Sequence, residues 1–230
     1  MPETRQCFLR LSQCEILDTW YTTGLCGTGS HDIAVRDVFV PGEHTFSFQD
    51  PELVKRSGPL YAFPFMFIAK GPGTALGIAR HAIDALTESA AAKTARRYTL
   101  GERVEAPKMV RDDVYIQDAV GRAETLLTSA RAHAFDVVGD LWASLLDGRQ
   151  PTERQIALFT TLYPHCVGLC AEVVQLIYKA AGGAAVYQKR PLYRCLRDIL
   201  TVNQHVVATA RTYEMAGRLL LGLEPLRWLF

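Results

Sequence analysis

A long run of apolar residues spaced three and four positions apart constrains the fold more than any other feature of this 230-residue sequence. Over about residues 112–146 the spacing is that of one face of an α-helix, while the opposite face is charged. A long helix with such a stripe must cover its apolar face against other helices, so the pattern predicts a helical bundle. The stripe comprises Ile116, Ala119, Val120, Ala123, Leu127, Ala130, Ala134, Val137, Leu141 and Leu145.

Two further segments are expected to be helical. The first covers about residues 60–98 and should be broken or kinked near Pro72, because proline lacks the backbone donor that a helix needs. The second begins at Thr152, with Gln155 three residues later in the pattern of a capping box. It should end at the pair Gly182-Gly183, which can supply a left-handed helix end.

The last helix is expected to span about residues 191–221. Pro191 suits the first turn of a helix, and Gly222 suits the position just past its end. Together with the preceding segments, it predicts a mainly α protein in which residues 59–230 form an antiparallel four-helix bundle.

Residues 1–58 have a different pattern and are expected to be the C-terminal part of a β domain, a remnant of a β-barrel. Residues 15–20 and 32–40 are predicted strands, and the second of them alternates apolar and polar positions. The connection between them, residues 24–30, contains three glycines, which permit positive φ angles. Because two strands are too few for a stable sheet, the beginning of this domain is expected to be absent.

Composition argues against several classes of partner. Lys and Arg number 25 against 24 Asp and Glu, so no broad charge attracts the chain to nucleic acid or to a membrane surface. No segment has the roughly 18 uninterrupted apolar residues of a membrane span, and no metal-binding C-x-x-C pair occurs. We therefore expect a cytoplasmic protein without a metal site, whose cysteines are reduced thiols: Cys7, Cys14, Cys26, Cys166, Cys170 and Cys195.

Two parts of the sequence carry a resemblance to a known family. Residues 18–41, DTWYTTGLCGTGSHDIAVRDVFVP, resemble the last strands of the middle β domain in the acyl-CoA dehydrogenase superfamily. The motifs RCLRD at 194–198, NQH at 203–205 and RTYEMAG at 211–217 are similar to the last bundle helix of its flavin-dependent two-component monooxygenases. Full members of the superfamily begin with a helical domain and further strands, so the resemblance implies a truncated chain.

The resemblance implies FAD or reduced FMN as the cofactor. Arg97 is similar to a bundle arginine that reaches the flavin pyrophosphate of a neighbouring subunit, although it could equally complement a helix end. Gly182 and Gly183 are similar to a glycine pair that lets the backbone approach the dinucleotide, although they could also serve only to end the helix. His31 is a further candidate for cofactor contact, beside a role in stabilising the turn.

His205 is the candidate catalytic residue. Acyl-CoA dehydrogenases use a carboxylate base, but the expected positions, residues 204–207 and 60–74, contain no glutamate or aspartate. The monooxygenase branch instead has a histidine near the flavin, and His205 fits that position. Its imidazole could orient or deprotonate a substrate hydroxyl or stabilise the flavin hydroperoxide, because its ordinary pKa lies near neutrality.

The leading hypothesis is a flavin-dependent oxidoreductase, a monooxygenase that hydroxylates an aromatic or polycyclic small molecule. An FAD-dependent acyl-CoA dehydrogenase and a truncated, inactive bundle that only oligomerises are the alternatives. The resemblance further implies a homo-oligomer, expected to be a tetramer, and a separate flavin reductase as partner.

Overall fold

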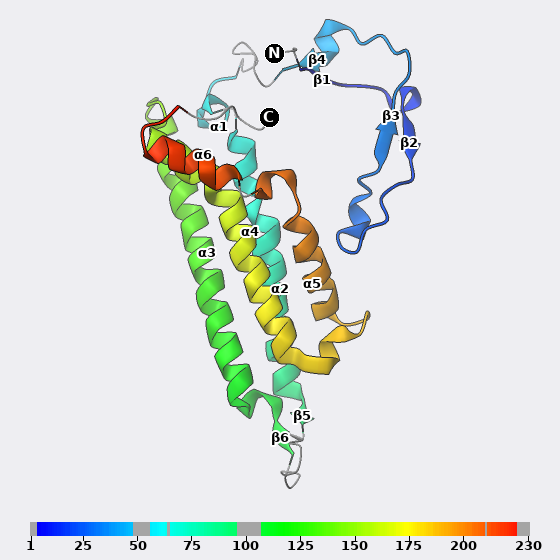
Figure 1. The fold of residues 1–230 in the computed structure, drawn as a ribbon, viewed down its shortest axis with the longest axis vertical. Helices are drawn as coiled ribbons and strands as arrows, with labels where there is room; N and C mark the ends of the chain where they lie inside the picture. The colour runs from blue at the N-terminus through cyan, green and yellow to red at the C-terminus, as the bar shows by residue number, and fades with distance from the viewer. Residues whose placement is uncertain (1–3, 48–55, 64, 96–106, 210, 225–230) are drawn as a thin grey trace.

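The computed structural model describes residues 4–47, 56–63, 65–95, 107–209 and 211–224. Its long helices run side by side in alternating directions, and small strands lie outside them (Figure 1). The four bundle helices are α2 (Pro72–Ala92), α3 (Val114–Leu146), α4 (Glu153–Ala181) and α5 (Pro191–Val202). The prediction of a mainly α chain with an antiparallel four-helix bundle is confirmed.

The predicted break in the first helical segment is confirmed. The short helix α1 (Pro59–Ala62) and a 3-10 helix (Met66–Lys70) come first, and α2 then begins with Pro72 in its first turn. The predicted end near residue 98 is wrong, because the backbone becomes extended at Lys93. It continues into a small hairpin that the sequence did not indicate, formed by β5 (Thr94–Ala95) and β6 (Lys108–Met109).

The capping box predicted at the start of α4 is confirmed. Thr152 Oγ1 accepts a hydrogen bond from the backbone N–H of Gln155 at 3.2 Å, and Gln155 Oε1 accepts one from the N–H of Thr152 at 2.9 Å. The Gln155 amide also donates to Ser144 Oγ of α3 at 2.8 Å. The cap therefore fixes the start of α4 and joins it to the end of α3.

Thr152→Ala should lower the free energy of unfolding by about 1 kcal/mol, because it leaves the N–H of Gln155 without its side-chain acceptor. Urea unfolding followed by circular dichroism would measure the change. Thr125→Ala is the matched control, since Thr125 is exposed within α3 and bonds only the carbonyl of the preceding turn. An equal loss in both variants would contradict the role of the cap.

The prediction of one continuous last helix over residues 191–221 is wrong. α5 ends at Val202, a 3-10 turn covers Val206–Ala208, and α6 (Arg211–Leu220) is a separate helix. The interruption arises because His205 and Thr209 have extended backbone, with ψ of 143° at both residues. The β-branched residues Val206, Val207 and Thr209 also favour a helix weakly. α6 consequently crosses α4, where Ala157 packs against Ala216 and Leu219.

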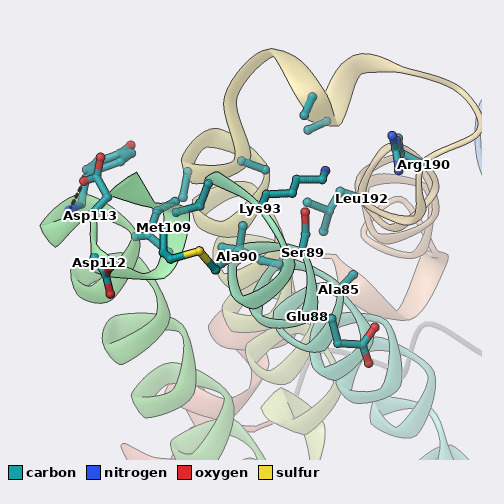
Figure 2. Close-up of a pocket in the computed structure, with 18 of the residues that line it drawn as sticks. Ala85, Glu88, Ser89, Ala90, Lys93, Met109, Asp112, Asp113, Arg190 and Leu192 are labelled. Atoms are coloured by element: carbon teal, nitrogen blue, oxygen red, sulfur yellow. Dashed lines mark hydrogen bonds between the residues drawn. The ribbon is translucent and has the colours of Figure 1, made fainter. Parts of the chain in front are cut away.

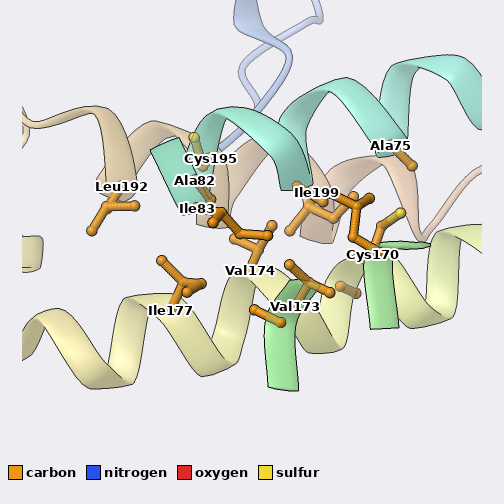
Figure 3. Close-up of a cluster of buried hydrophobic side chains, with 14 of the residues drawn as sticks. Ala75, Ala82, Ile83, Cys170, Val173, Val174, Ile177, Leu192, Cys195 and Ile199 are labelled. Atoms are coloured by element: carbon orange, nitrogen blue, oxygen red, sulfur yellow. The ribbon is translucent and has the colours of Figure 1, made fainter. Parts of the chain in front are cut away.

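The main core lies between α2, α4 and α5 (Figure 3). Its fully buried members include Ile83 of α2, Val174 and Ile177 of α4, and Ile199 of α5. α4 and the turn after it, Glu153–Val186, are long and apolar enough to cross a membrane by composition alone. However, 56% of that apolar window is buried inside the protein, as expected of the central helix of a bundle.

The strands before the bundle pair as short antiparallel ladders. β2 (Glu15–Leu17) pairs with β3 (Asp32–Ala34), and β1 (Gln6–Cys7) pairs with β4 (Thr45–Phe46). The strands predicted over residues 15–20 and 32–40 are thus present but shorter. This part lies beside the bundle and approaches α5 through the connection between β2 and β3 (Figure 1). The division into residues 1–58 and 59–230 stays a prediction.

Candidate functional site

A cavity lies at each end of α5. The larger, about 830 Å³, is at its N-terminal end and is also lined by the end of α2, the β5–β6 hairpin and the start of α3 (Figure 2). The smaller, about 450 Å³, lies at the break between α5 and α6. Because α5 has 12 residues, the two places are separated by about 18 Å of helix.

Charged side chains of both signs line the larger cavity, with Glu88 and Lys108 among them. Lys93 extends from the end of α2 toward the start of α5, where Arg190 lies (Figure 2). Asp112 and Asp113 lie across the cavity at the start of α3, and Asp113 accepts a hydrogen bond from the N–H of Tyr115 at 2.8 Å. Asp113 is occupied as the cap of α3. Lys93 and Arg190 lie away from it, so an anionic group could bind beside these two side chains.

The predicted cofactor residues Gly182 and Gly183 lie in the turn that borders this cavity. Gly182 has φ of 61° and ends α4, so the role in ending the helix is confirmed. A Cβ atom at either glycine would meet no heavy atom of the described residues within 4 Å. The space beside their backbone is therefore open to a ligand. Arg97, the third cofactor candidate, lies outside the described residues.

The sequence placed His205 within a helix. In the structure it lies in the break between α5 and α6. Its side chain is exposed and lines the smaller cavity. Its Nδ1 atom accepts a hydrogen bond from the N–H of Val207 at 3.3 Å. An imidazole that accepts at Nδ1 carries its proton at Nε2 when neutral, so His205 presents a hydrogen-bond donor to a ligand.

Tyr163 of α4 supports the His205 ring. The two ring centroids are 5.7 Å apart, with the planes inclined by 46°. Tyr163 is only 8% exposed, and burial raises the pKa of its phenol, which therefore stays neutral. A Cβ atom at Gly71 would lie 2.4 Å from Tyr163 Cδ2, so Gly71 makes room for this ring. The apolar spacing of α4 gave no indication of this role.

His31 contributes to the turn that follows β2. Its Nδ1 atom accepts hydrogen bonds from the backbone N–H groups of Thr19 and Trp20, each at 3.2 Å. These bonds support the turn-stabilising role that was the alternative to cofactor contact. The candidate residues thus lie apart: the glycine pair belongs to the turn whose alanines, Ala181 and Ala184, line the larger cavity, His205 lines the smaller one, and His31 belongs to the β2–β3 connection.

The glycine-rich connection is docked on α5. Asp198 Oδ1 accepts a hydrogen bond from the N–H of Leu25 at 2.8 Å, and the Trp20 indole donates to the Leu25 carbonyl at 3.1 Å. Gly24 approaches so closely that a Cβ atom there would lie 2.1 Å from the carbonyl oxygen of Arg197. Sequence reasoning missed this pairing, because Leu25 and Asp198 are 173 positions apart and no local pattern links them.

The buried thiols of α4 are not nucleophiles at neutral pH. Burial raises the pKa of Cys166 to about 11 and that of Cys170 to about 12, so both stay protonated. All six cysteines are free. Across the part of the chain that the structure describes, no group of three or more His, Cys, Asp or Glu side chains could hold a metal ion.

Two monooxygenases are similar in sequence to this chain over most of its length. Indole-3-acetate monooxygenase of Pseudomonas putida is 32% identical over 225 residues, which are 96% of this chain and 55% of that protein. The flavin-dependent monooxygenase oxygenase subunit HsaA of Mycobacterium tuberculosis is 26% identical over 93% of this chain and 55% of its own length. The chain thus spans about half the length of the curated relatives it matches.

Solved structures agree with this relationship. The crystal structure of the HsaA monooxygenase from M. tuberculosis matches with a TM-score of 0.81 at 26% identity, over 96% of this chain and 57% of that one. XiaF from Streptomyces, in complex with FADH2 and glycerol, shares the fold with a TM-score of 0.80 at 21% identity, over 98% of this chain and 57% of its own. The sequence model described as acyl-CoA dehydrogenase, C-terminal domain, matches residues 72–210, and the chain therefore belongs to that family.

Proposed function

We propose that the chain acts in a flavin-dependent monooxygenase, as its oxygenase component, and hydroxylates a small aromatic substrate. The observation that carries the proposal is His205, which lines a cavity that has no carboxylate among its described lining residues. An acyl-CoA dehydrogenase would need a carboxylate base there. The similarity to a protein named indole-3-acetate monooxygenase supports the same chemistry, and an aromatic acid such as indole-3-acetate is the first substrate to test.

The residues around the larger cavity fit the phosphate-bearing end of FAD or reduced FMN. Lys93 and Arg190 would contact phosphate oxygens, and the open backbone at Gly182 and Gly183 would lie beside them. We keep Arg97 as a further proposed contact. Bound reduced flavin would supply the two electrons that let one atom of dioxygen enter the product and the other leave as water.

His205 would act through its Nε2–H group. The bond from Val207 to Nδ1 holds the imidazole as a donor at Nε2, and the ring of Tyr163 limits its rotation. A donor in this position can orient a substrate oxygen or transfer a proton to it. His205 is therefore proposed as the catalytic residue and Tyr163 as its positioning residue.

We further propose a flavin reductase as partner, self-association of the chain and a cytoplasmic location. Among the oxygenase relatives, HsaA is named an oxygenase subunit, which supports a separate source of reduced flavin. The exposed side chains of Phe135, Trp142 and Leu146 on α3 support an oligomer, since association would cover them. A tetramer is the state to test by light scattering.

His205→Ala should lower hydroxylation of indole-3-acetate by about 100-fold or more, as expected for loss of an acid–base or orienting group. The assay uses the 230-residue chain with reduced flavin and oxygen, and flavin affinity should stay unchanged because the flavin contacts proposed above lie at the other end of α5. His44→Ala is the matched control, since His44 is exposed on the β side.

Three results would redirect the proposal. An unchanged rate in His205→Ala would remove this residue from catalysis. Anaerobic bleaching of bound FAD by an acyl-CoA would favour the dehydrogenase. Failure of the chain to bind either flavin would favour an inactive bundle that only oligomerises.

A further inference from the structure

The smaller cavity is rich in hydrogen-bond donors. The side chains of Asn203, Gln204, His205 and Arg211 line it together with Val206, Ala208 and Thr209. In the described ranges, the side chains of Asn203, Gln204 and Arg211 have no hydrogen-bond partner, and no carboxylate borders the cavity. Three side chains that carry free donors and face no carboxylate can serve a ligand that is rich in acceptor atoms.

Arg211 is the charged group of this cavity. Among the other arginines, Arg80 pairs with Glu124 at 2.6 Å, and Arg218 donates to the carbonyl of Glu224 at 3.0 Å. By contrast, no carboxylate of the described residues lies within 4 Å of the Arg211 guanidinium. Among the described residues that line the cavity, Arg211 thus carries a permanent positive charge that no carboxylate faces.

The backbone fixes where Arg211 begins α6. The N–H of Arg211 donates to Thr209 Oγ1 at 3.4 Å, and the hydroxyl of Thr212 donates to the Thr209 carbonyl at 2.8 Å. Thr209 thus holds the first turn of α6 next to the 3-10 turn that begins at His205. As a result, the guanidinium of Arg211 and the imidazole of His205 line the same cavity, although six positions separate these residues in sequence.

We infer that Arg211 determines substrate specificity by binding the carboxylate of an aromatic acid in the cavity that also contains His205. A guanidinium matches a carboxylate with two parallel hydrogen bonds, and Asn203 and Gln204 can donate to the same group. Val206 and Ala208 give the aromatic part apolar contact. This inference rests on the proposed function and deepens it, because it names the residue that would select aromatic compounds with an anionic side chain.

The test compares an acid with its neutral amide. Indole-3-acetate and indole-3-acetamide are titrated into the flavin-loaded chain by calorimetry, and kcat and KM are measured for both. Arg211→Gln should weaken binding of the acid and raise its KM by about 10-fold to 100-fold, the range for a hydrogen bond to a charged group. Binding of the amide and kcat should stay nearly unchanged, and Arg211→Lys should recover part of the loss.

Arg218→Gln is the matched control, because Arg218 lies on the same helix and donates only to the carbonyl of Glu224. Equal binding of acid and amide by the unchanged chain, or an Arg211→Gln variant that binds the acid as well as before, overturns the inference. Hydroxylation of both compounds in that case would leave the proposed function standing. If neither compound is hydroxylated, the proposed function fails. The calorimetric comparison of indole-3-acetate with indole-3-acetamide then still decides whether Arg211 binds a carboxylate.

Discussion

Replacing Ile199 with alanine should lower the free energy of unfolding by about 2–5 kcal/mol, the range for large-to-small substitutions at well-packed sites. Ile199 is fully buried on α5, in the cluster that contains Ile83 of α2 and Val174 of α4 (Figure 3). The variant removes three carbon atoms and leaves a cavity between three helices, which can collapse only partly. Urea unfolding followed by circular dichroism gives the change directly.

Leu200→Ala provides the matched control. It follows Ile199 on the same helix, removes the same number of carbon atoms and has the same effect on helix propensity within a few tenths of a kcal/mol. Leu200 is 43% exposed, so its truncation should cost well under the loss at Ile199. Equal losses at the two positions would mean that α5 does not bury the face seen in the structure.

The helices that sequence alone predicted best are those defined by local signals. The apolar stripe over residues 112–146 corresponds to α3, which spans Val114–Leu146. The capping box at Thr152 and the glycine pair after Ala181 delimit α4 almost to the residue. In both helices the signals that start, continue and end the helix lie within the segment itself, so no tertiary contact was needed to find them.

The break between α5 and α6 was missed because tertiary contacts decide it. Pro191 and Gly222 are sound end signals, but they belong to two helices. The weak helix formers Val206, Val207 and Thr209 allow an interruption without requiring one. Across the break, Ala216 and Leu219 of α6 pack on Ala157 of α4, a contact that no local pattern reveals.

The candidate site was predictable in part. The resemblance made His205 a candidate but placed it within a helix, whereas its backbone is extended and its Nδ1 atom accepts a hydrogen bond from the N–H of Val207. The roles proposed for Tyr163 and Arg211 rest on how α4 and α6 meet that break, which no local sequence pattern indicates. Arg97 and the domain boundary at residue 58 stay predictions.

Gly24→Ala should detach the glycine-rich connection from α5. The added Cβ atom would lie 2.1 Å from the carbonyl oxygen of Arg197 and 2.6 Å from Thr201 Oγ1, far inside normal contact distances. The Arg197 carbonyl also accepts a hydrogen bond from Thr201 at 2.9 Å, so it belongs to the ordered backbone of α5 and cannot easily move. The connection must therefore shift away, and the bond from Leu25 to Asp198 should break.

Loss of that bond has a further cost at Leu25. Its φ of 52° lies in the left-handed region, which disfavours a leucine by about 1–2 kcal/mol. Its N–H and carbonyl groups are held by Asp198 and Trp20, and these bonds maintain the conformation. Hydrogen exchange at the Leu25 amide should therefore accelerate by about 10-fold to 100-fold in Gly24→Ala, the range for a hydrogen bond to a charged acceptor.

Three variants separate this docking from general loosening of the connection. Gly27→Ala is the control, because a Cβ atom at Gly27 meets nothing within 4 Å and φ there is not positive, so exchange at Leu25 should stay slow. Asp198→Ala should reproduce the effect of Gly24→Ala, since it removes the acceptor itself. Asp198→Asn keeps an acceptor oxygen without the charge, so its exchange rate at Leu25 should lie between those of the unchanged chain and Asp198→Ala. Unchanged, slow exchange at Leu25 in Gly24→Ala would contradict the close approach of Gly24 to the backbone of α5.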